Sequence, residues 1–288
     1  MSNKQVIGNW KGERMNMGAT VVKQALPTAQ VQQISPFLLL HHFGPTFAPI
    51  GGDPLDVGPH PHRGFEPVTF LYSGGIRHKD SRGNEGILSG GDVQWMTAGM
   101  GIIHSERASQ TFLEQGGIME GIQLWINLPA KDKMIQPTYQ DIKSDQIPAW
   151  QSADGKASFR LVAGQYQEFK GPAKTHTPIL ALQLELQAGA EVNIDIPDGF
   201  QTMLYWLDGA VADEAGIVYE AETLLHFSND GQSIALKGVQ QSRGLLLAGA
   251  PIPEPLAQWG PFVMNTQTEI MEAMRDYQMG KMGIYIED

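Results

Sequence analysis

Three histidines and one glutamate in the first half of the chain have the types and the spacing of a metal site. The first segment reads GPHPHRGFEP, with His60 and His62 two residues apart, and the second reads GMGIIHSE, with His104 and Glu106 at the same spacing. In an extended strand, residues two apart point to the same face, so each pair can converge on one point. Such ligands suit Fe, Mn, Ni, Cu or Zn and leave coordination positions open. The pattern predicts a metal centre of the catalytic kind.

The main alternative is that the histidines have no common role. His60 and His62 lie among prolines and could belong to a surface loop. The second pair favours the metal interpretation, because it follows a Gly-rich turn in an apolar setting, where an unpartnered His and Glu would be costly to bury. Glu66 follows His62 by four residues and would share its face if the chain stays extended. Spacing therefore leaves Glu66 and Glu106 as rival carboxylate ligands.

Composition removes several other kinds of chemistry. The chain has no cysteine, which excludes disulfide scaffolds, thiol catalysis, Fe–S clusters and cysteine-based zinc sites. Its 20 basic and 31 acidic residues give a net charge of −11, so direct binding to nucleic acid is not expected. The first residues do not resemble a signal peptide, and no apolar run reaches the length of a membrane span. We therefore expect a cytoplasmic protein without a membrane contact.

The elements that position these residues are predicted to be short strands. The 288 residues include 33 glycines and 18 prolines, which separate apolar runs with a period of two and indicate an all-β chain. Its length suggests two domains. The strands are expected at Phe37–Leu40, Val68–Tyr72, Val93–Trp95, Ile118–Leu128, Phe159–Val162, Ile179–Leu186, Val192–Ile196, Met203–Leu207, Thr223–Phe227, Ile234–Leu236 and Leu245–Ala248.

The polar stretch from about residue 129 to 151, which contains two prolines and no sustained alternation, is predicted to connect the domains. The expected boundaries are 1–135 for the first domain, 150–265 for the second and 266–288 for a helical tail. In that tail, Thr266 and Glu269 form a capping-box pattern. One face of this helix is apolar and is expected to dock on a barrel; it carries Ile270, Met274 and Tyr277.

Longer motifs resemble those of the cupin superfamily, and specifically the pirins. The similarity covers HPHRGFE, the H-x-D-S-x-G pattern from His78 to Gly83, GDVQWMTAG, and GPFVMNT at Gly260–Thr266. It implies a jelly-roll bicupin, with two cupin-type β-barrels and a short C-terminal helix. The first barrel would bind a metal and the second would not. In the second half, His176 and His226 stand far apart and form no His-x-His pair, which agrees with one metal per chain.

The resemblance also implies the ligands and the chemistry. By similarity to pirins the ligands are His60, His62, His104 and Glu106, which selects Glu106 over Glu66. The expected cofactor is one divalent ion, Fe(II), with Ni, Mn, Cu and Zn as alternatives. The implied activity is that of a quercetin 2,3-dioxygenase, in which a small aromatic flavonol and O2 react and Glu106 acts as the catalytic base. The alternative is a metal-dependent regulatory protein that binds an enzyme or transcription factor without turnover.

A sugar-phosphate isomerase of the cupin type is a third hypothesis. It requires basic residues that face the site, whereas strand alternation points Arg63 and Arg107 away from the ligands.

Some residues depart from the family pattern or have two interpretations. His41 replaces a residue that is commonly acidic in pirins, and Pro67 stands where threonine is usual; both could alter the pocket. His42 and His78 are expected to be wall or hydrogen-bonded histidines rather than ligands. A further set is expected to be plain core rather than pocket lining: Phe43, Phe65, Trp95 and Met96.

Overall fold

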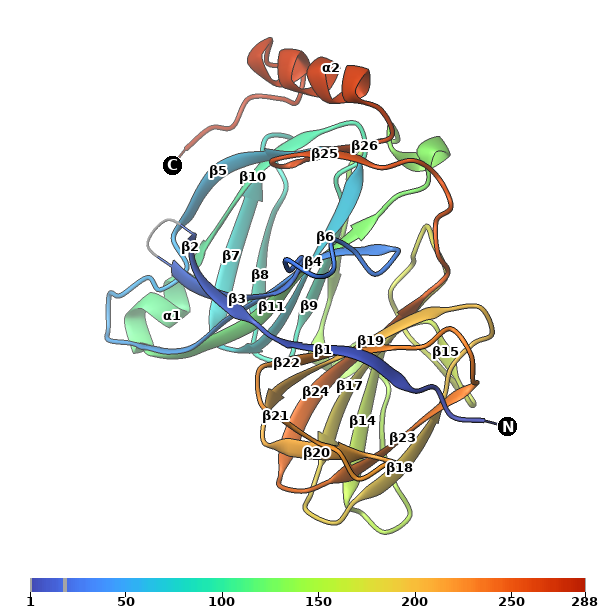
Figure 1. Ribbon diagram of the computed structural model, residues 1–288. Helices are drawn as coiled ribbons and strands as arrows, with labels where there is room; N and C mark the ends of the chain where they lie inside the picture. The colour runs from blue at the N-terminus through green and yellow to red at the C-terminus, as the bar shows by residue number, and fades with distance from the viewer. Residues whose placement is uncertain (1, 18–19, 288) are drawn as a thin grey trace. The chain divides into compact units, whose positions relative to one another are not determined.

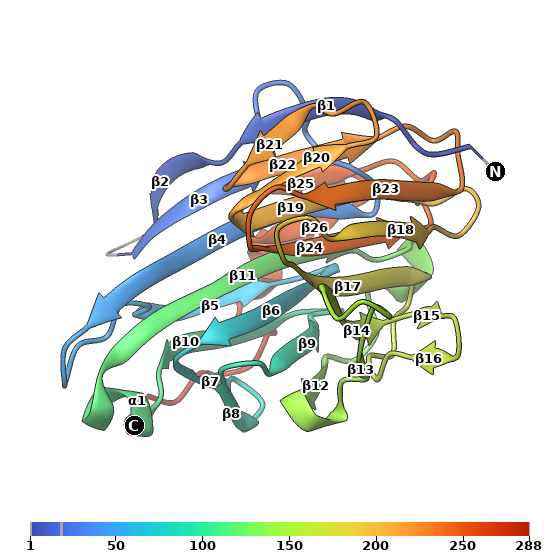
Figure 2. The same ribbon diagram turned by 90° about the horizontal axis from the view of Figure 1, so that it is seen from below.

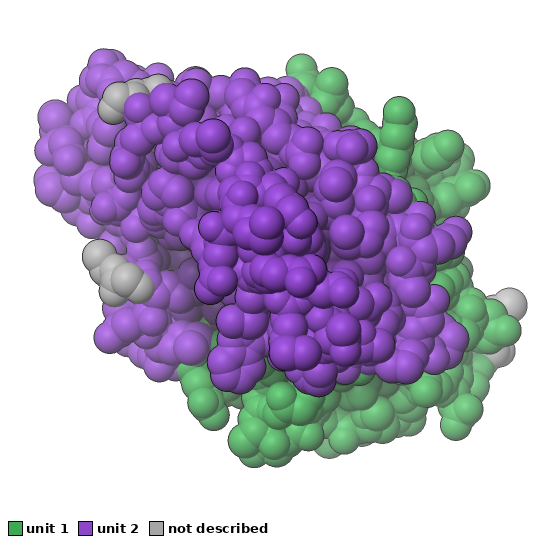
Figure 3. Space-filling view, turned by 90° about the horizontal axis from the view of Figure 1, so that it is seen from above, with its two compact units in different colours: residues 1–13, 23–38, 145–251 green, residues 14–22, 39–144, 252–288 purple. Residues whose placement is uncertain are grey.

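The computed structural model describes residues 2–17 and 20–287, and most of its regular structure is β-strand (Figures 1 and 2). The chain divides into two compact units (Figure 3). Unit 1 comprises residues 1–13, 23–38 and 145–251, and unit 2 comprises residues 14–22, 39–144 and 252–288. The predicted all-β class is confirmed, as is the pair of strand-built barrels.

Unit 2 is built around a seven-stranded and a four-stranded sheet. In spatial order, the first contains β12 (Thr138–Ile142), β9 (Val93–Thr97), β6 (Phe65–Ser73), β11 (Gly117–Asn127), β4 (Phe37–Ala48), β3 (Thr20–Leu26) and β2 (Glu13–Met17). The second contains β5 (Val57–His62), β10 (Ile102–Ala108), β7 (Gly75–Asp80) and β8 (Glu85–Ser89).

Unit 1 repeats this plan of seven strands and four. Its larger sheet has the order β1 (Val6–Lys11), β22 (Thr223–Phe227), β19 (Gln201–Asp208), β24 (Ser242–Gly249), β17 (Ile179–Leu186), β14 (Ala157–Ala163) and β13 (Ala149–Gln151). Its smaller sheet has the order β18 (Glu191–Asp195), β23 (Ser233–Gly238), β20 (Ala210–Asp213) and β21 (Val218–Glu220).

Two short hairpins and few helical segments complete the structure. The hairpins pair β15 (Gln165–Tyr166) with β16 (Phe169–Lys170), and β25 (Ala257–Trp259) with β26 (Phe262–Met264). The α-helices are α1 (Gln110–Gln115) and α2 (Gln267–Gln278), and the 3-10 turns are η1 (Ala130–Asp132) and η2 (Ser144–Gln146). In the part of the chain that the structure describes, no helix has the length and apolar character needed to cross a membrane.

The expected connection at residues 129–151 contains regular structure. It includes β12, which pairs with β9, and β13, which pairs with β14. Pro137 and Pro148 each stand immediately before one of these strands. A proline at that position does not remove a hydrogen-bond donor from the body of the strand, which is why it does not interrupt the pairing. The stretch thus contains two short strands, and one boundary between the two units, between residues 144 and 145, falls inside it.

The units are not continuous in sequence, in contrast to the predicted boundaries. Residues 1–13 belong to unit 1, where β1 pairs antiparallel with β22 and covers an edge of the larger sheet. The C-terminal residues 252–288 belong to unit 2. The division falls within β3 and within β4, so short apolar runs alone did not reveal it.

The interior of unit 1 is filled by apolar side chains. Large buried residues such as Trp206, Leu246 and Phe227 belong to one continuous hydrophobic cluster. Trp150 stacks on Phe169 with ring centroids 4.3 Å apart. These side chains form the close-packed apolar interior of this barrel.

The C-terminal helix begins as predicted. Thr266 accepts a hydrogen bond from the backbone N–H of Glu269, whose side chain in turn accepts one from the backbone N–H of Thr266. The docked face differs from the expectation, because Ile270 and Ala273 are buried whereas Met274 and Tyr277 are exposed. The part of α2 that the rest of unit 2 covers is narrower than the apolar face of the helix, so Ile270 and Ala273 are buried and the outer apolar side chains are not.

Candidate metal centre

The predicted histidines come together on two neighbouring strands. Strands β5 and β10 are antiparallel, with His104 directly opposite His60 and Ile102 opposite His62. Because side chains two apart share a face, this register places all three imidazoles on one side of the sheet. A register shift separates this pairing from the next pair, Glu106 and Val57.

The three imidazoles are close enough to share one ion. One nitrogen of each of His60, His62 and His104 lies within 4.8 Å of the corresponding nitrogens of the other two. The ring centroids are 4.5–4.9 Å apart. The Nδ1 of His60 donates a hydrogen bond to the carbonyl oxygen of Gly58 at 2.9 Å, which leaves its Nε2 lone pair free. The group thus offers three convergent imidazole nitrogens.

Burial keeps two of these rings neutral. Desolvation, with a smaller contribution from the neighbouring His60, lowers the pKa of His62 well below its usual value, and the same causes act on His104. The buried Nδ1 of His62 and both ring nitrogens of His104 have no hydrogen-bond partner among the described residues. Neutral imidazole is the form that binds a metal, and unpartnered buried nitrogens are otherwise costly. The donor set and its environment therefore fit a divalent cation.

Glu106 lies on β10, two residues beyond His104, and lines the same cavity as His60 and His62. Its Oε1 accepts a hydrogen bond of 3.1 Å from the hydroxyl of Thr69. Among the described residues, the group of convergent ligand atoms contains the three histidines and does not include this carboxylate. Its role as a fourth ligand remains a prediction.

The rival carboxylate, Glu66, has another partner. It is buried in β6, and its Oε1 accepts a hydrogen bond of 2.8 Å from the hydroxyl of Thr97. Burial raises the pKa of Glu66 to about 7, with the Thr97 bond opposing this shift. The structure does not bring Glu66 into the histidine group.

We expect Glu66→Gln to remove a pH dependence of stability. Because its folded pKa is raised from 4.5 to about 7, the proton on Glu66 stabilises the protein fully below pH 4.5, and this contribution is lost as pH rises through 7. Glutamine keeps the acceptor for Thr97 without the buried charge. In denaturant titrations, the variant should match the wild type near pH 4.5 and exceed its unfolding free energy by ~1–3 kcal/mol at pH 8.

The exposed Glu185 supplies the control, since Glu185→Gln also removes one carboxylate. An unchanged pH slope in Glu66→Gln would contradict the assignment of this titration to Glu66.

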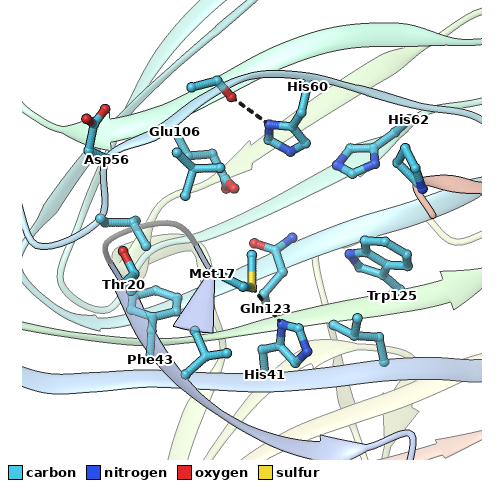
Figure 4. A pocket seen from close by; sticks show the side chains of 16 residues that line it. Met17, Thr20, His41, Phe43, Asp56, His60, His62, Glu106, Gln123 and Trp125 are labelled. Atoms are coloured by element: carbon cyan, nitrogen blue, oxygen red, sulfur yellow. Dashed lines mark hydrogen bonds between the residues drawn. The ribbon is translucent and has the colours of Figure 1, made fainter. Parts of the chain in front are cut away.

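The imidazoles open onto a cavity of about 450 Å³ (Figure 4). Its wall is mainly apolar and includes Phe43 and Trp125, with Gln123 and His41 among its few polar groups. Figure 4 shows Gln123 and Met17 between His41 and the two strand-β5 histidines. The Nδ1 of His41 lies 3.1 Å from the sulfur of Met17, and burial lowers the pKa of His41 to about 4. His41 therefore lines the cavity as a neutral imidazole, whereas Asp56 and Glu106 supply carboxylates to the same lining.

Four residues, Phe43, Phe65, Trp95 and Met96, were expected to belong to the core rather than to the cavity wall. All four are buried core residues as expected, and Phe43 also lines the cavity. Pro67 lies in β6 directly opposite the cavity residue Trp125.

The other two histidines of this unit have carboxylate neighbours. The Nε2 of His42 lies 3.4 Å from Glu120, and the Nε2 of His78 lies 3.6 Å from Asp141. This placement agrees with the expectation that neither is a ligand.

The two arginines next to the ligands are held by other groups. Arg63 donates to the carbonyl oxygen of Met100 and to the carboxylate of Asp276, at 2.7 and 3.1 Å. Arg107 donates to Glu287 at 2.8 Å. Neither arginine is among the described residues that line the cavity, so the phosphate-binding groups of the isomerase hypothesis are missing there.

Sequence reasoning missed two sets of supporting residues. The ammonium group of Lys133 is buried and donates to the carbonyl oxygens of Gly64 and Val263 and to the side chain of Asn127, at 2.8, 3.1 and 2.6 Å. Thr69 and Gln123 were missed as well, although they bear on Glu106. None of them belongs to a local pattern, because their partners are distant in sequence.

Comparisons with known proteins agree with this geometry. The family model described as Pirin matches residues 19–126, and the model of the Pirin C-terminal cupin domain matches residues 181–283. Human pirin is 37% identical over 267 residues, which cover 91% of this chain and 87% of that protein. Pirin-like protein 2 of Arabidopsis thaliana is 38% identical over 271 residues, covering 91% and 80% of the two chains.

A solved structure shares the fold of this chain. The crystal structure of quercetin 2,3-dioxygenase from Acinetobacter baumannii superposes with a TM-score of 0.94 at 38% identity, covering 99% of this chain and 100% of that one. Its similarity confirms the cupin fold and, with the three-histidine group, implies a divalent metal site. On the strength of both family models and of these relatives, the chain belongs to the pirin family.

Proposed function

We propose that this protein is a mononuclear metal-dependent dioxygenase that opens the ring of a flavonol such as quercetin with O2. The observation that carries the proposal is the group of three convergent imidazoles, two of them buried, at the wall of an apolar cavity. A related solved structure bears the name quercetin 2,3-dioxygenase. An apolar cavity with few polar groups suits a planar aromatic substrate.

His60, His62 and His104 would hold the ion, and Glu106 would complete the site as a fourth ligand when its carboxylate turns toward them. Iron(II) is the proposed ion because imidazole and carboxylate ligands with open positions suit oxygen chemistry. Nickel, manganese, copper and zinc are competitors for the same donors. Elemental analysis of protein purified without added metal identifies the ion.

The bound metal would supply a positive charge that lowers the pKa of the flavonol 3-hydroxyl and a position where O2 can react. The chain's own residues bind and orient the flavonol. Phe43 and Trp125 offer apolar surface to its rings, and the cavity wall excludes water. Glu106 lies in the same cavity and accepts the proton of the 3-hydroxyl. The overall reaction consumes one flavonol and one O2 and releases carbon monoxide with the opened ester product.

Oxygen uptake tests the proposal. Protein loaded anaerobically with Fe(II) and then given quercetin and O2 should consume both in equal amounts. Compared with the wild type at full Fe(II) occupancy, Glu106→Gln should lose turnover by about 10²–10⁴-fold, because the proton acceptor is gone. Absence of turnover at full metal occupancy would overturn the proposal for flavonols and favour the metal-dependent regulatory role.

A further inference from the structure

The C-terminal tail, defined as residues 282–287, follows α2 and is bonded to the ligand-bearing strand β10 (Figure 1). The hydroxyl of Tyr285 lies 2.7 Å from the hydroxyl of Ser105. Two residues further along the same strand, Arg107 donates to the carboxylate of Glu287 at 2.8 Å. The tail therefore contacts two alternate positions of β10.

Side-chain alternation places the tail and the metal ligands on opposite faces of β10. His104 and Glu106 share one face of the strand, so Ser105 and Arg107 point to the other. Glu106 lines the cavity, whereas Ser105 and Arg107 line a small surface hollow together with the tail. The Nε of Arg107 also lies 3.2 Å from Asp56, a residue of the cavity wall. A movement of the tail would thus reach the ligands through the backbone of a single strand.

The beginning of the tail is fixed at the beginning of β10. The hydroxyl of Ser81 donates to the carbonyl oxygen of Met282 at 2.7 Å and accepts from the backbone N–H of Ile103 at 3.1 Å. Met282 is fully buried in an apolar cluster against which Ile103 packs. A Cβ at Gly101 would lie 2.7 Å from the Cγ of Met282, so the turn before β10 is in close contact with the tail. The serine of the H-x-D-S-x-G motif therefore joins the tail to the ligand strand.

The tail supports β10 where the pairing of this strand with β5 is irregular. The register between the two strands shifts between His104 and Glu106, whereas the pairing of β10 with β7 is regular. Such a shift disrupts the local hydrogen-bond ladder on that side. Ser105 lies within the shift, and Arg107 directly follows it. The bonds from the tail thus restrain the strand on both sides of Glu106.

We propose that the tail is a strap that holds β10 in the position at which His104 and Glu106 meet the ion, with Tyr285 and Glu287 as its positioning residues. Ligating groups must be held to within about 0.5 Å, so a strand restrained on its outer face binds a metal more tightly than the same strand without that restraint. Tail docking and metal binding then strengthen each other by the same factor, because coupling between two sites is reciprocal. The inference rests on the proposed metal site and is independent of the substrate.

The Co²⁺ affinity of the full-length, metal-stripped protein tests the strap from the metal side. We expect Tyr285→Phe to bind Co²⁺ about fivefold more weakly than the wild type, and Glu287→Gln to lose a similar factor. Tyr277→Phe is the matched control, because it removes a phenol hydroxyl from α2 and should leave the affinity unchanged. A role in stability alone would lower Tm without changing the affinity of the folded protein.

A double-mutant cycle assigns the effect to the bond between tail and strand. Ser105→Ala should lower the Co²⁺ affinity as much as Tyr285→Phe does, and the combined variant should show no further loss. Should Ser105→Ala fold poorly by near-ultraviolet circular dichroism, the affinities of Tyr285→Phe and Glu287→Gln carry the test.

Trypsin cleavage after Lys281 tests the strap from the tail side. Met282, on the other side of that peptide bond, is fully buried, so the bond is cut only when the tail lifts. Cleavage through a rapid opening follows the population of the open form. Saturating Co²⁺ should therefore slow release of the residues after Lys281 about fivefold, measured by mass spectrometry. In His62→Ala, which lacks one imidazole of the site, Co²⁺ should not change the rate.

Three results would overturn the inference: an unchanged Co²⁺ affinity in Tyr285→Phe, an equal loss in Tyr277→Phe, or a cleavage rate after Lys281 that Co²⁺ leaves unchanged in the wild type. Absence of quercetin turnover, with the affinity changes as expected, would overturn the dioxygenase proposal and leave the strap standing. The two proposals are therefore separable.

Discussion

Replacing His62 with alanine is expected to abolish stoichiometric metal binding. The ring of His62 is buried, and its centroid lies 4.6 Å from that of His60 and 4.9 Å from that of His104. Loss of a group that merely supports a ligand costs about 10–100-fold in affinity, so loss of a ligand should cost more than ~100-fold. Metal content after dialysis, measured by elemental analysis, should fall from one ion per chain to nearly none. Iron-dependent quercetin turnover should disappear with it.

The chain offers a matched control outside the site. His176 is an exposed histidine of unit 1, so His176→Ala removes an imidazole without touching the cavity. It should retain one metal ion. Full occupancy in His62→Ala, or an equal loss in both variants, would show that the three-histidine group is not the metal centre.

Replacing Lys133 with methionine is expected to destabilise unit 2 strongly. The ammonium has three protons and three acceptors, the carbonyl oxygens of Gly64 and Val263 and the side-chain oxygen of Asn127. Methionine fills a similar volume and leaves these buried acceptors without a donor. At 1–3 kcal/mol for each unsatisfied group, partly relieved by rearrangement, the loss is ~2–4 kcal/mol. Thermal unfolding followed by near-ultraviolet circular dichroism should show a Tm lower by at least about 5 °C.

The Lys133→Met variant can also be followed by its affinity for Co²⁺, because the bonding partner Gly64 lies close to the histidines in sequence. Gly64 follows His62 by two residues, and a Cβ at Gly64 would lie 1.9 Å from the carbonyl oxygen of Val263, so the two backbones are in close contact. Loosening that contact should also weaken Co²⁺ binding.

The neighbouring Lys131 provides the control for this prediction. Its side chain is 79% exposed and 4.0 Å from Asp132, so Lys131→Met should change Tm little. An equal Tm for both variants would show that the three bonds of Lys133 contribute no net stability.

Local spacing predicted which ligand side chains share a face, although neither β5 nor β10 was among the strands expected from the apolar runs. In strand β10 the alternation of side chains is a property of the backbone, so His104 and Glu106 share a face in any pairing. The His60 and His62 pair follows the same rule on β5. Only the structure shows that the two pairs lie on neighbouring strands, through the register of β5 against β10.

Local patterns failed where the partner is remote. The apolar runs did not show that residues 1–13 belong to unit 1, because β1 is defined by its pairing with β22 more than 200 residues away. The docked face of α2 was also overestimated, since periodicity shows which side chains share a face and not how many a neighbour covers. Met274 and Tyr277 remain exposed for that reason.

The sequence by itself determined the all-β class, the donor types of the metal centre and the absence of thiol chemistry, since these follow from composition and from a two-residue period. Spacing left Glu66 and Glu106 as rivals and the family resemblance favoured Glu106, whereas only the tertiary structure shows what each carboxylate bonds to. Glu66 bonds to Thr97, and Glu106 bonds to Thr69 across two sheets. Such contacts join residues more than 30 positions apart, and their existence depends on strand register and sheet packing, which no local spacing specifies.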